Sequence, residues 1–414
     1  MLDRLKSALN SGLILLLQDL PTRGKLLNMI SVKYRLLALN CLLFAVAILH
    51  ASAAEVVIQP TPDGGLQPRL ITDQAGNIHL LYFKKRSDQP RVREGNLYYR
   101  QYLSSEGRWG LPIKVSSQAF NVETFSIARA GMAIDGTGRI HVIWYRGREA
   151  EYLYARSDAA RSAFEPQQSM VSDYIEGVDA GADIAAEGNH VAIVWGAGDL
   201  SREYERTVFV RLSSDNGASF GPEILAGNQD IGACACCSLA TDFSDGDNLL
   251  VAYRSAINGI GRHMQLLTLG IAENSLAHSS YGEVHPLQEW EISSCPLSTN
   301  DIAADRDGQQ WVVFETAARI VQKRLSAESI PSLVAEPFTK SRQKNPAIAF
   351  NAQGQHLIVW GEGISHSRGG RLNMQLFDAD DEALDTGFSE TIEIPEFSFP
   401  AAALLPTGEF LVLY

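Results

Sequence analysis

A hairpin motif recurs seven times along this chain and limits the folds open to it. Each copy has an apolar strand, a turn that usually contains Asp and Gly, and a second apolar strand often ending in an aromatic residue. The turn glycines stand 46 to 62 residues apart, at Gly76, Gly138, Gly188, Gly246, Gly308, Gly354 and Gly408. Two further strand-like runs separate most copies, as at 207–212 and 222–225. Four strands per period predict the blade of a β-propeller, a radial fold with few exposed sheet edges.

The predicted fold is therefore all-β, with six or seven four-stranded blades. Long helical periodicity is absent after residue 53, which leaves no signal for an α/β architecture. The seventh hairpin ends at Tyr414 and has no outer strands of its own. The β-branched run at 55–59 is expected to supply one, so that the N- and C-terminal strands share a blade and close the ring.

The N-terminal region predicts export. Lys33 and Arg35 precede an uncharged apolar stretch, 36–49, and a run of small residues, Ala51-Ser52-Ala53. This order is typical of a secretory signal peptide, and we expect cleavage after Ala53. The stretch of 14 residues is shorter than the roughly 20 that a membrane-spanning helix needs. We therefore divide the chain into an extension with signal peptide at 1–53, starting at Met1 or Met29, and a propeller at 54–414. The mature protein is expected in the periplasm or secreted, without a stable membrane span.

Charge excludes one class of partner. The chain has 35 basic and 48 acidic residues, and the six bases and two acids of residues 1–53 leave a formal charge of −17 after residue 53. Such a surface repels phosphate backbones, and no basic stripe offsets it. Nucleic-acid binding is not expected. With 45% hydrophobic and 20% charged residues, the chain can bury a full core, and we expect a folded monomer.

A turn motif carries a family resemblance. The segment 213–220, Ser-Ser-Asp-Asn-Gly-Ala-Ser-Phe, matches the Asp-box pattern through Ser213, Asp215, Gly217 and Phe220. Degenerate copies stand at 157–164 and 104–109. Asp accepts hydrogen bonds within such a turn, and Gly tolerates a positive φ. The chain after residue 54 thus resembles the sialidase-like (neuraminidase, BNR Asp-box repeat) propellers. In that family the box is structural and lies opposite the active centre.

The resemblance implies an active centre that can be sought in this sequence. Sialidase-like sites clamp a substrate carboxylate with three arginines, which suits the planar guanidinium, and use Tyr with Glu as nucleophile. Here Arg146, Arg254 and Arg262 follow second strands, and Tyr204 and Glu205 lie in a comparable loop. These five residues are the candidate catalytic set of an exo-α-sialidase-type glycoside hydrolase. The family's early Arg-Ile-Pro signature is missing, and solvated loop charges are the competing interpretation.

The cysteines are the sharpest chemical feature. Removal of Cys41 with the signal peptide leaves Cys234, Cys236, Cys237 and Cys295. The repeat phase places all four in loops that lead into innermost strands of adjacent blades, so their sulfurs are expected to converge beside the central channel. Export favours two disulfides. A soft-metal site for copper or zinc, completed by His263, and a redox-active pair are the alternatives. The Cys-Ala-Cys-Cys run and residues 290–296 also resemble a subgroup of exported bacterial sialidase-like proteins of uncertain activity.

Three functions follow from these features. The first is a non-hydrolytic module that binds a glycan or a protein through the face that carries the cysteines. The second is the glycoside hydrolase, and the third is a thiolate protein for copper or zinc. The propeller itself requires no cofactor. Fold alone does not choose among these functions, because propellers host many of them.

Overall fold

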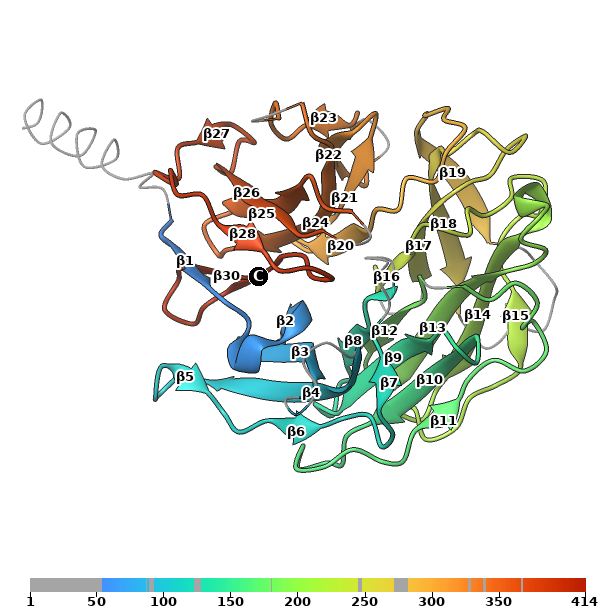
Figure 1. Ribbon diagram of the computed structural model, residues 1–414, viewed down its shortest axis with the longest axis horizontal. Helices are drawn as coiled ribbons and strands as arrows, with labels where there is room; N and C mark the ends of the chain where they lie inside the picture. Colours follow the sequence, from blue (N-terminus) through green and yellow to red (C-terminus); the bar gives the residue numbers. More distant parts are fainter. Residues whose placement is uncertain are drawn as a thin grey trace, which may run out of the picture. The chain divides into compact units, whose positions relative to one another are not determined.

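The computed structural model describes residues 54–414 except 87, 89–92, 123–127, 180, 245–247, 272–281, 327–328, 338–339 and 366–367. The described residues form a β-propeller of seven blades (Figure 1). The predicted all-β propeller is confirmed, and of the six or seven blades expected the structure has seven. The predicted signal peptide at 1–53 and the turn residue Gly246 lie outside the described residues, so their assignments stay predictions.

Three blades come first along the chain, each listed here from its inner strand outward. Blade 1 consists of β2 (Leu66–Thr72), β3 (Ile78–Lys85), β4 (Glu94–Leu103) and β5 (Arg108–Trp109), with β6 (Ile113–Lys114) and β7 (Phe120–Asn121) also paired to β4. Blade 2 consists of β8 (Gly131–Ile134), β9 (Ile140–Arg146), β10 (Glu151–Arg156) and β11 (Gln168–Ser169). Blade 3 consists of β12 (Asp183–Glu187), β13 (His190–Ala197), β14 (Thr207–Ser213) and β15 (Glu223–Leu225).

The next three blades repeat this antiparallel order. Blade 4 consists of β16 (Ala240–Phe243), β17 (Asn248–Arg254), β18 (Met264–Gly270) and β19 (Glu283–Gln288). Blade 5 consists of β20 (Asn300–Ala304), β21 (Gln310–Thr316), β22 (Arg319–Arg324) and β23 (Ser332–Leu333). Blade 6 consists of β24 (Gln343–Phe350), β25 (His356–Glu362), β26 (Gly370–Phe377) and β27 (Ala383–Leu384), with β28 (Glu393–Ile394) on β26. Two short 3-10 turns are η1 (Pro62–Gly64) and η3 (Glu203–Glu205).

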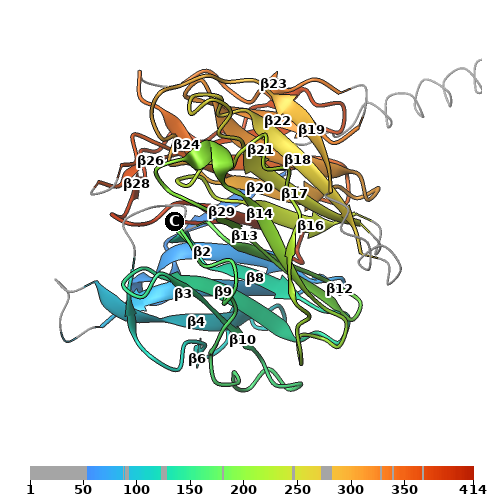
Figure 2. The ribbon, with the colours of Figure 1, turned by 90° about the vertical axis from the view of Figure 1, so that its right-hand side faces the viewer.

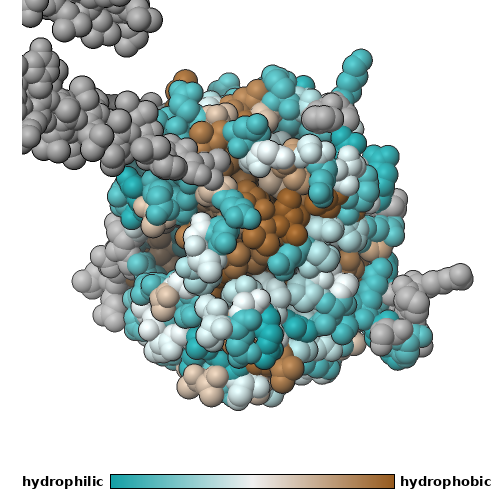
Figure 3. All heavy atoms as spheres, turned by 90° about the vertical axis from the view of Figure 1, so that its left-hand side faces the viewer, coloured by the Kyte–Doolittle hydropathy of each residue, from teal (hydrophilic) through white to brown (hydrophobic). Residues whose placement is uncertain are grey.

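Blade 7 joins the two ends of the described chain. Its hairpin is β29 (Ala401–Leu404) and β30 (Phe410–Leu413), and β1 (Val56–Gln59) pairs with β30 in parallel. The predicted closure by N- and C-terminal strands is confirmed. The backbone N–H of Thr61 and its hydroxyl both donate to the carbonyl of Tyr414, at 2.9 and 2.8 Å. Blade 7 has three strands where the others have four or more, and apolar surface shows on the side of the propeller where β1 lies (Figure 3).

The turn chemistry explains why the hairpins form where the sequence predicts them. The carboxylates of Asp73, Asp135 and Asp305 each accept backbone N–H groups two and four residues later, at 2.8 to 3.0 Å. The following glycines at 76, 138 and 308 have φ between +79° and +81°, a region that glycine enters without steric cost. Each turn therefore fixes the register of the two inner strands of its blade.

The core lies between blades. Seven clusters of buried apolar side chains each join two neighbouring blades, as where Val194 and Val210 of blade 3 pack with Leu249 and Val251 of blade 4. The innermost strands contact one another in sequence around the axis, and β29 contacts β2, so the ring is closed (Figures 1 and 2). Among the described residues, no helix is long and apolar enough to cross a membrane.

Candidate functional site

Strand alternation sorts the loops onto two faces of the propeller. Because successive strands of blades 1 to 6 are antiparallel, the turns between first and second strands share one face with those between third and fourth strands. The loops between second and third strands lie on the opposite face, together with the loops that lead into the next blade. We call this second face the cysteine face. In blades 3 to 5 it comprises the loops at 170–182, 198–206, 226–239, 255–263 and 289–299.

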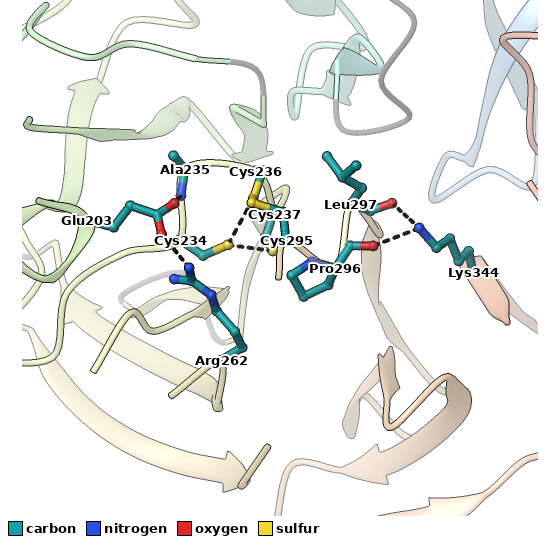
Figure 4. The surroundings of a disulfide bond; sticks show 10 residues. All are labelled: Glu203, Cys234, Ala235, Cys236, Cys237, Arg262, Cys295, Pro296, Leu297 and Lys344. Carbon is teal, nitrogen blue, oxygen red and sulfur yellow. Dashed lines mark hydrogen bonds and ion pairs between the residues drawn. A yellow bond between two sulfur atoms is a disulfide. The ribbon is translucent and has the colours of Figure 1, made fainter. Parts of the chain in front are cut away.

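The four cysteines after residue 53 meet on this face (Figure 4). Cys234, Cys236 and Cys237 lie in the loop that leads into blade 4, and Cys295 lies in the loop that leads into blade 5. Cys236 and Cys295 form a disulfide, with Cα atoms 5.9 Å apart. Cys234 and Cys237 are free, buried thiols whose sulfurs are 2.8 Å apart. The site therefore holds one disulfide and one dithiol, where the sequence favours two disulfides.

Backbone contacts hold the cysteine loop in place. The N–H of Cys234 donates to the carbonyl of Arg254 at 2.9 Å, and the N–H of Ala235 donates to a carboxylate oxygen of Glu203 at 3.0 Å. Gly181 has φ of +114°, and a Cβ there would lie 2.9 Å from the carbonyl oxygen of Cys237. Only glycine fits this close approach, so three neighbouring segments fix where the sulfurs lie.

A buried ion pair stands next to the thiols. Arg262 donates to Glu203, with side-chain exposures of 5% and 17%. The Nε and Nη1 groups of Arg262 have no hydrogen-bond partner. Burial alone would raise the pKa of Cys234, but the hydrogen bond with Cys237 and the charge of Arg262 outweigh it and lower that pKa. Burial and the same hydrogen bond raise the pKa of Cys237 well above its usual value.

Lys344 anchors the other side of the disulfide (Figure 4). Its ammonium donates to the carbonyls of Pro296 and Leu297 at 2.7 and 3.3 Å. These two residues directly follow Cys295, and burial lowers the pKa of the lysine. Sequence reasoning missed Lys344, Glu203 and Gly181. Only Glu203 had a signal that could have pointed to it, because it is adjacent to the candidate residues Tyr204 and Glu205.

Among the five candidate catalytic residues, a direct contact joins Arg254 and Arg262. Arg254 and Arg262 are neighbours, since a guanidinium N–H of Arg254 donates to the carbonyl of Arg262 at 3.0 Å. Arg254 also donates to the carbonyl of Glu315 and lies over the ring of Trp290, 5.1 Å from its centroid. Arg146, Arg254 and Arg262 all donate hydrogen bonds to groups of the protein itself.

The remaining candidates lie outside that contact. Arg146, at the end of β9, pairs with Glu149 and Glu151. Tyr204 is 47% exposed, and Glu205 pairs with Arg202 at 2.6 Å. His263, the residue expected to complete a copper or zinc site, accepts a hydrogen bond from the backbone N–H of Trp290 at 2.9 Å.

The turn at 213–220 has the local bonding that its sequence suggests. The Asp215 carboxylate accepts from the Ser213 hydroxyl at 2.7 Å, and from the backbone N–H and hydroxyl of Ser219 at 2.9 and 2.6 Å. Phe220 packs edge-on against Tyr154 of blade 2. In the weaker copy, Asp158 accepts the same two bonds from Ser162. Both turns lie between third and fourth strands, on the face opposite the cysteines. Assignment of these turns to the Asp-box family remains a prediction.

A central cavity of about 740 Å³ lies along the inner strands. Charged side chains in its wall include Arg69, Arg129, Asp242 and Asp301, and Arg69 donates to Asp301 at 3.0 Å. Burial and the charge of Arg69 lower the pKa of Arg129 to about 10. No cysteine and none of the five candidate catalytic residues is among the residues that line this cavity.

Two sets of side chains near the cysteines have the spacing of metal ligands. The sulfurs of Cys234, Cys236 and Cys237 lie within 4.8 Å of one another, as do one oxygen of Glu203 and the sulfurs of Cys236 and Cys295. Each set includes a sulfur of the Cys236–Cys295 disulfide. Metal ligation requires thiolates, so the pairing in this structure leaves two of the four sulfurs for that purpose.

Comparison with known proteins shows the fold. No protein-family profile matches the chain, and no significant match was found among curated proteins. A protein of unknown function from Dyadobacter fermentans is 11% identical, covering 78% of this chain and 96% of its own, with a TM-score of 0.52. An α-L-arabinanase of Penicillium chrysogenum, solved with arabinobiose, is 10% identical, with coverages of 80% and 99% and a TM-score of 0.52.

A Hadza microbial sialidase is 13% identical over 77% of this chain and 66% of its own, with a TM-score of 0.46. Sialidases and an arabinanase are thus among the structural neighbours. At these identities the first two likenesses support the propeller fold, and the sialidase likeness carries no argument. The narrower resemblance to Asp-box sialidases and to the Cys-Ala-Cys-Cys subgroup stays a prediction.

Proposed function

We propose that this chain is an exported, non-hydrolytic binding protein that recognises a partner protein through its cysteine face. The observation that carries the proposal is the distribution of exposed apolar side chains. Among the described residues, eight large apolar side chains are exposed, and five of them lie in loops of the cysteine face, at 39% to 51% exposure: Tyr174, Ile175, Leu200, Tyr204 and Ile260. Gathered apolar groups on an otherwise polar surface are typical of protein-interaction sites.

Backbone hydrogen bonds join these loops into one surface. Gly198 donates to the carbonyl of Glu176 at 2.8 Å, which links the first two loops. Ala233 donates to the carbonyl of Glu203 at 3.4 Å, and Ile292 donates to that of Ile260 at 2.9 Å. The apolar residues and the disulfide therefore share one continuous region.

Charge defines the partner further. Exposed carboxylates stand on the same loops, at Glu176, Asp230, Glu289 and Glu291. Because opposite charges favour encounter and correct partner choice, the partner is expected to present apolar side chains with Lys or Arg around them. The disulfide fits an oxidising compartment such as the periplasm or the extracellular space.

The arginine contacts favour binding over hydrolysis. A carboxylate clamp needs guanidinium donors directed at a ligand. Arg146 instead donates to Glu151, Arg254 to backbone carbonyls, and Arg262 to Glu203. A protein rather than a glycan is proposed because aliphatic Ile175, Leu200 and Ile260 accompany the two tyrosines.

The test uses two substitutions and a matched control. Ile260→Asp and Tyr204→Asp should lower partner affinity at least about 10-fold, since each places a charge in an apolar contact. Ile330→Asp is the control, because Ile330 is 82% exposed and lies between β22 and β23, off the cysteine face. The partner is identified by cross-linking in the exporting cell, then purified and measured by calorimetry.

A defined protein that binds wild type and Ile330→Asp, and loses affinity for the other two variants, supports the proposal. Equal binding by all four proteins overturns it. Turnover of a fluorogenic sialoside between pH 4 and 8 would overturn the proposal in favour of a glycoside hydrolase. A glycan ligand whose binding depends on Tyr204 would overturn it in favour of a glycan-binding protein.

A further inference from the structure

We propose that the four cysteines form a two-stage thiol–disulfide exchange site, in which the buried pair Cys234/Cys237 passes electrons through the Cys236–Cys295 disulfide to a disulfide of the bound protein. The identity of the final acceptor rests on the proposed function. The exchange between the two cysteine pairs does not, because it lies within this chain.

Exposure distinguishes Cys295 from the other three cysteines. Cys295 is exposed, whereas Cys236, Cys234 and Cys237 are 9%, 7% and 3% exposed. A macromolecular disulfide can therefore approach the exposed residue Cys295, whereas the dithiol is buried. Any redox traffic between the buried pair and a partner must pass through the Cys236–Cys295 disulfide.

Distance permits that passage. The sulfur of Cys234 lies 3.7 Å from that of Cys236, which is van der Waals contact and a suitable starting separation for attack on a disulfide. The sulfur of Cys237 lies 2.8 Å from that of Cys234. Cys234 and Cys237 also have Cys-x-x-Cys spacing, in which one thiol attacks and the second resolves. The three sulfurs need no rearrangement of blades to meet.

The surroundings assign the roles. Arg262 and the hydrogen bond with Cys237 favour the thiolate at Cys234, while burial keeps Cys237 protonated. Thiolate is the attacking species in exchange. Cys234 is therefore the nucleophile and Cys237 the resolving thiol, and Lys344 holds the carbonyls of Pro296 and Leu297 beside the leaving sulfur.

The internal step conserves electrons. The Cys234 thiolate attacks the sulfur of Cys236, the Cys236–Cys295 bond breaks, and Cys295 leaves as a thiolate. Cys237 then loses its proton and attacks Cys234, which releases Cys236 as a thiolate that takes up that proton. The net result is a Cys234–Cys237 disulfide and a Cys236/Cys295 dithiol of which Cys295 is exposed, with no external oxidant or reductant.

The external step consumes a disulfide of the partner. The Cys295 thiolate attacks one sulfur of that disulfide and releases the other as a thiolate. Cys236 then attacks Cys295, which restores the Cys236–Cys295 bond and frees the second thiol of the partner. Two electrons have passed from Cys234 and Cys237 to the partner, and a protein dithiol is the class of reductant that would reset the buried pair.

The experiment uses oxidised glutathione as a small disulfide probe. The exported full-length protein, purified without oxygen, is mixed with the probe, quenched in acid at timed intervals and mapped by mass spectrometry. Wild type should show a transient glutathione adduct at Cys295, release two glutathione molecules per chain, and end with both disulfides formed. Cys236→Ser should keep the adduct at Cys295, because the resolving sulfur is gone.

Cys234→Ser should lower adduct formation at Cys295 at least about 100-fold, because the outer disulfide then has no internal attacker. Ser294→Ala, an exposed neighbour of Cys295, is the matched control and should react within about twofold of wild type. If the cysteine variants fail to fold, the wild-type time course alone tests the proposal, because a first glutathione adduct at Cys295 supports it. A first adduct at Cys234 or Cys237, or a Cys295 that never leaves its disulfide, overturns the proposal.

The two proposals fail separately. Ile260→Asp should lose partner affinity and still exchange with glutathione, whereas Cys234→Ser should keep partner affinity and lose exchange. If the wild-type protein binds its partner but shows no thiol–disulfide exchange, only the exchange proposal is overturned. Stoichiometric Cu(I) binding that leaves Cys295 permanently in its disulfide also overturns the exchange proposal.

Discussion

The guanidinium of Arg262 donates to the carboxylate of Glu203 and thereby joins loops of blades 4 and 3 beside the buried thiol of Cys234 (Figure 4). Glu203 also accepts from the backbone N–H of Ala235, inside the cysteine run. One carboxylate thus holds both the cation and the loop whose sulfur that cation stabilises. This arrangement explains how Cys234 differs from Cys237 although both are buried.

Arg262→Gln tests this electrostatic role. Loss of the positive charge should raise the pKa of Cys234 and slow its alkylation at pH 7 about 10-fold for each pKa unit. Breaking the buried pair should also lower the free energy of unfolding by about 3 kcal/mol. Alkylation rates between pH 5 and 9, with urea unfolding, measure both effects.

Arg202→Gln is the control for that prediction. Arg202 pairs with Asp199 and Glu205 but is 52% exposed, so its loss should change stability by less than about 1 kcal/mol. An unchanged alkylation profile in Arg262→Gln would contradict the assigned role of the arginine.

Gly217→Ala should destabilise the protein by about 3 kcal/mol. Gly217 has φ of +68°, and a Cβ there would overlap the hydroxyl of Tyr154 and lie 2.9 Å from Nδ1 of His141. The substitution therefore adds the cost of a left-handed residue to the disruption of a buried hydrogen bond. Gly107→Ala is matched, with φ of +63° and open space around its Cβ, and should cost about 1 kcal/mol. Equal losses in urea unfolding would show that backbone strain alone matters.

The propeller was predictable because its determinants are local and repeated. A turn with Asp and Gly fixes a hairpin locally, and seven hairpins, most of them followed by two outer strands, leave few alternatives. The convergence of the cysteines followed from the same repeat phase, since Cys237 and Cys295 precede innermost strands of adjacent blades.

Side-chain pairing was not predictable from repeat phase. Three cysteines within four residues can each approach Cys295, and only the path of the loop selects Cys236. The arginines illustrate the same limit. Their positions after second strands were evident, but whether Arg146 points to a ligand or to Glu151 depends on loop geometry. Glu203 was missed because the loop 199–205 offers several similar acids.

Asp135→Asn should weaken acid resistance in a defined pH range. Burial alone would raise the pKa of Asp135, but hydrogen bonds from His141, Thr137 and Arg139 outweigh it and lower that pKa to about 2. A lowered carboxyl pKa gives stability that is present above about pH 4 and lost as the pH falls to about 2. The variant should lose about 2 kcal/mol at pH 7 and match wild type near pH 2. Asp307→Asn, at an exposed turn position, should follow wild type throughout.

Asp242→Asn should raise the free energy of unfolding at neutral pH, opposite to the effect of Asp135→Asn. Burial raises the pKa of Asp242 to about 6, against hydrogen bonds from Gln310 and the backbone N–H of Phe243. The folded protein then holds this proton more tightly than the unfolded chain, so the free energy of unfolding falls as the pH rises from about 4 to 6. Removal of the charge should stabilise the protein by about 1 to 2 kcal/mol at pH 8 and change nothing at pH 4. Urea unfolding at both pH values measures the difference, and an equal effect at pH 4 and pH 8 would assign Asp242 a structural role independent of its titration.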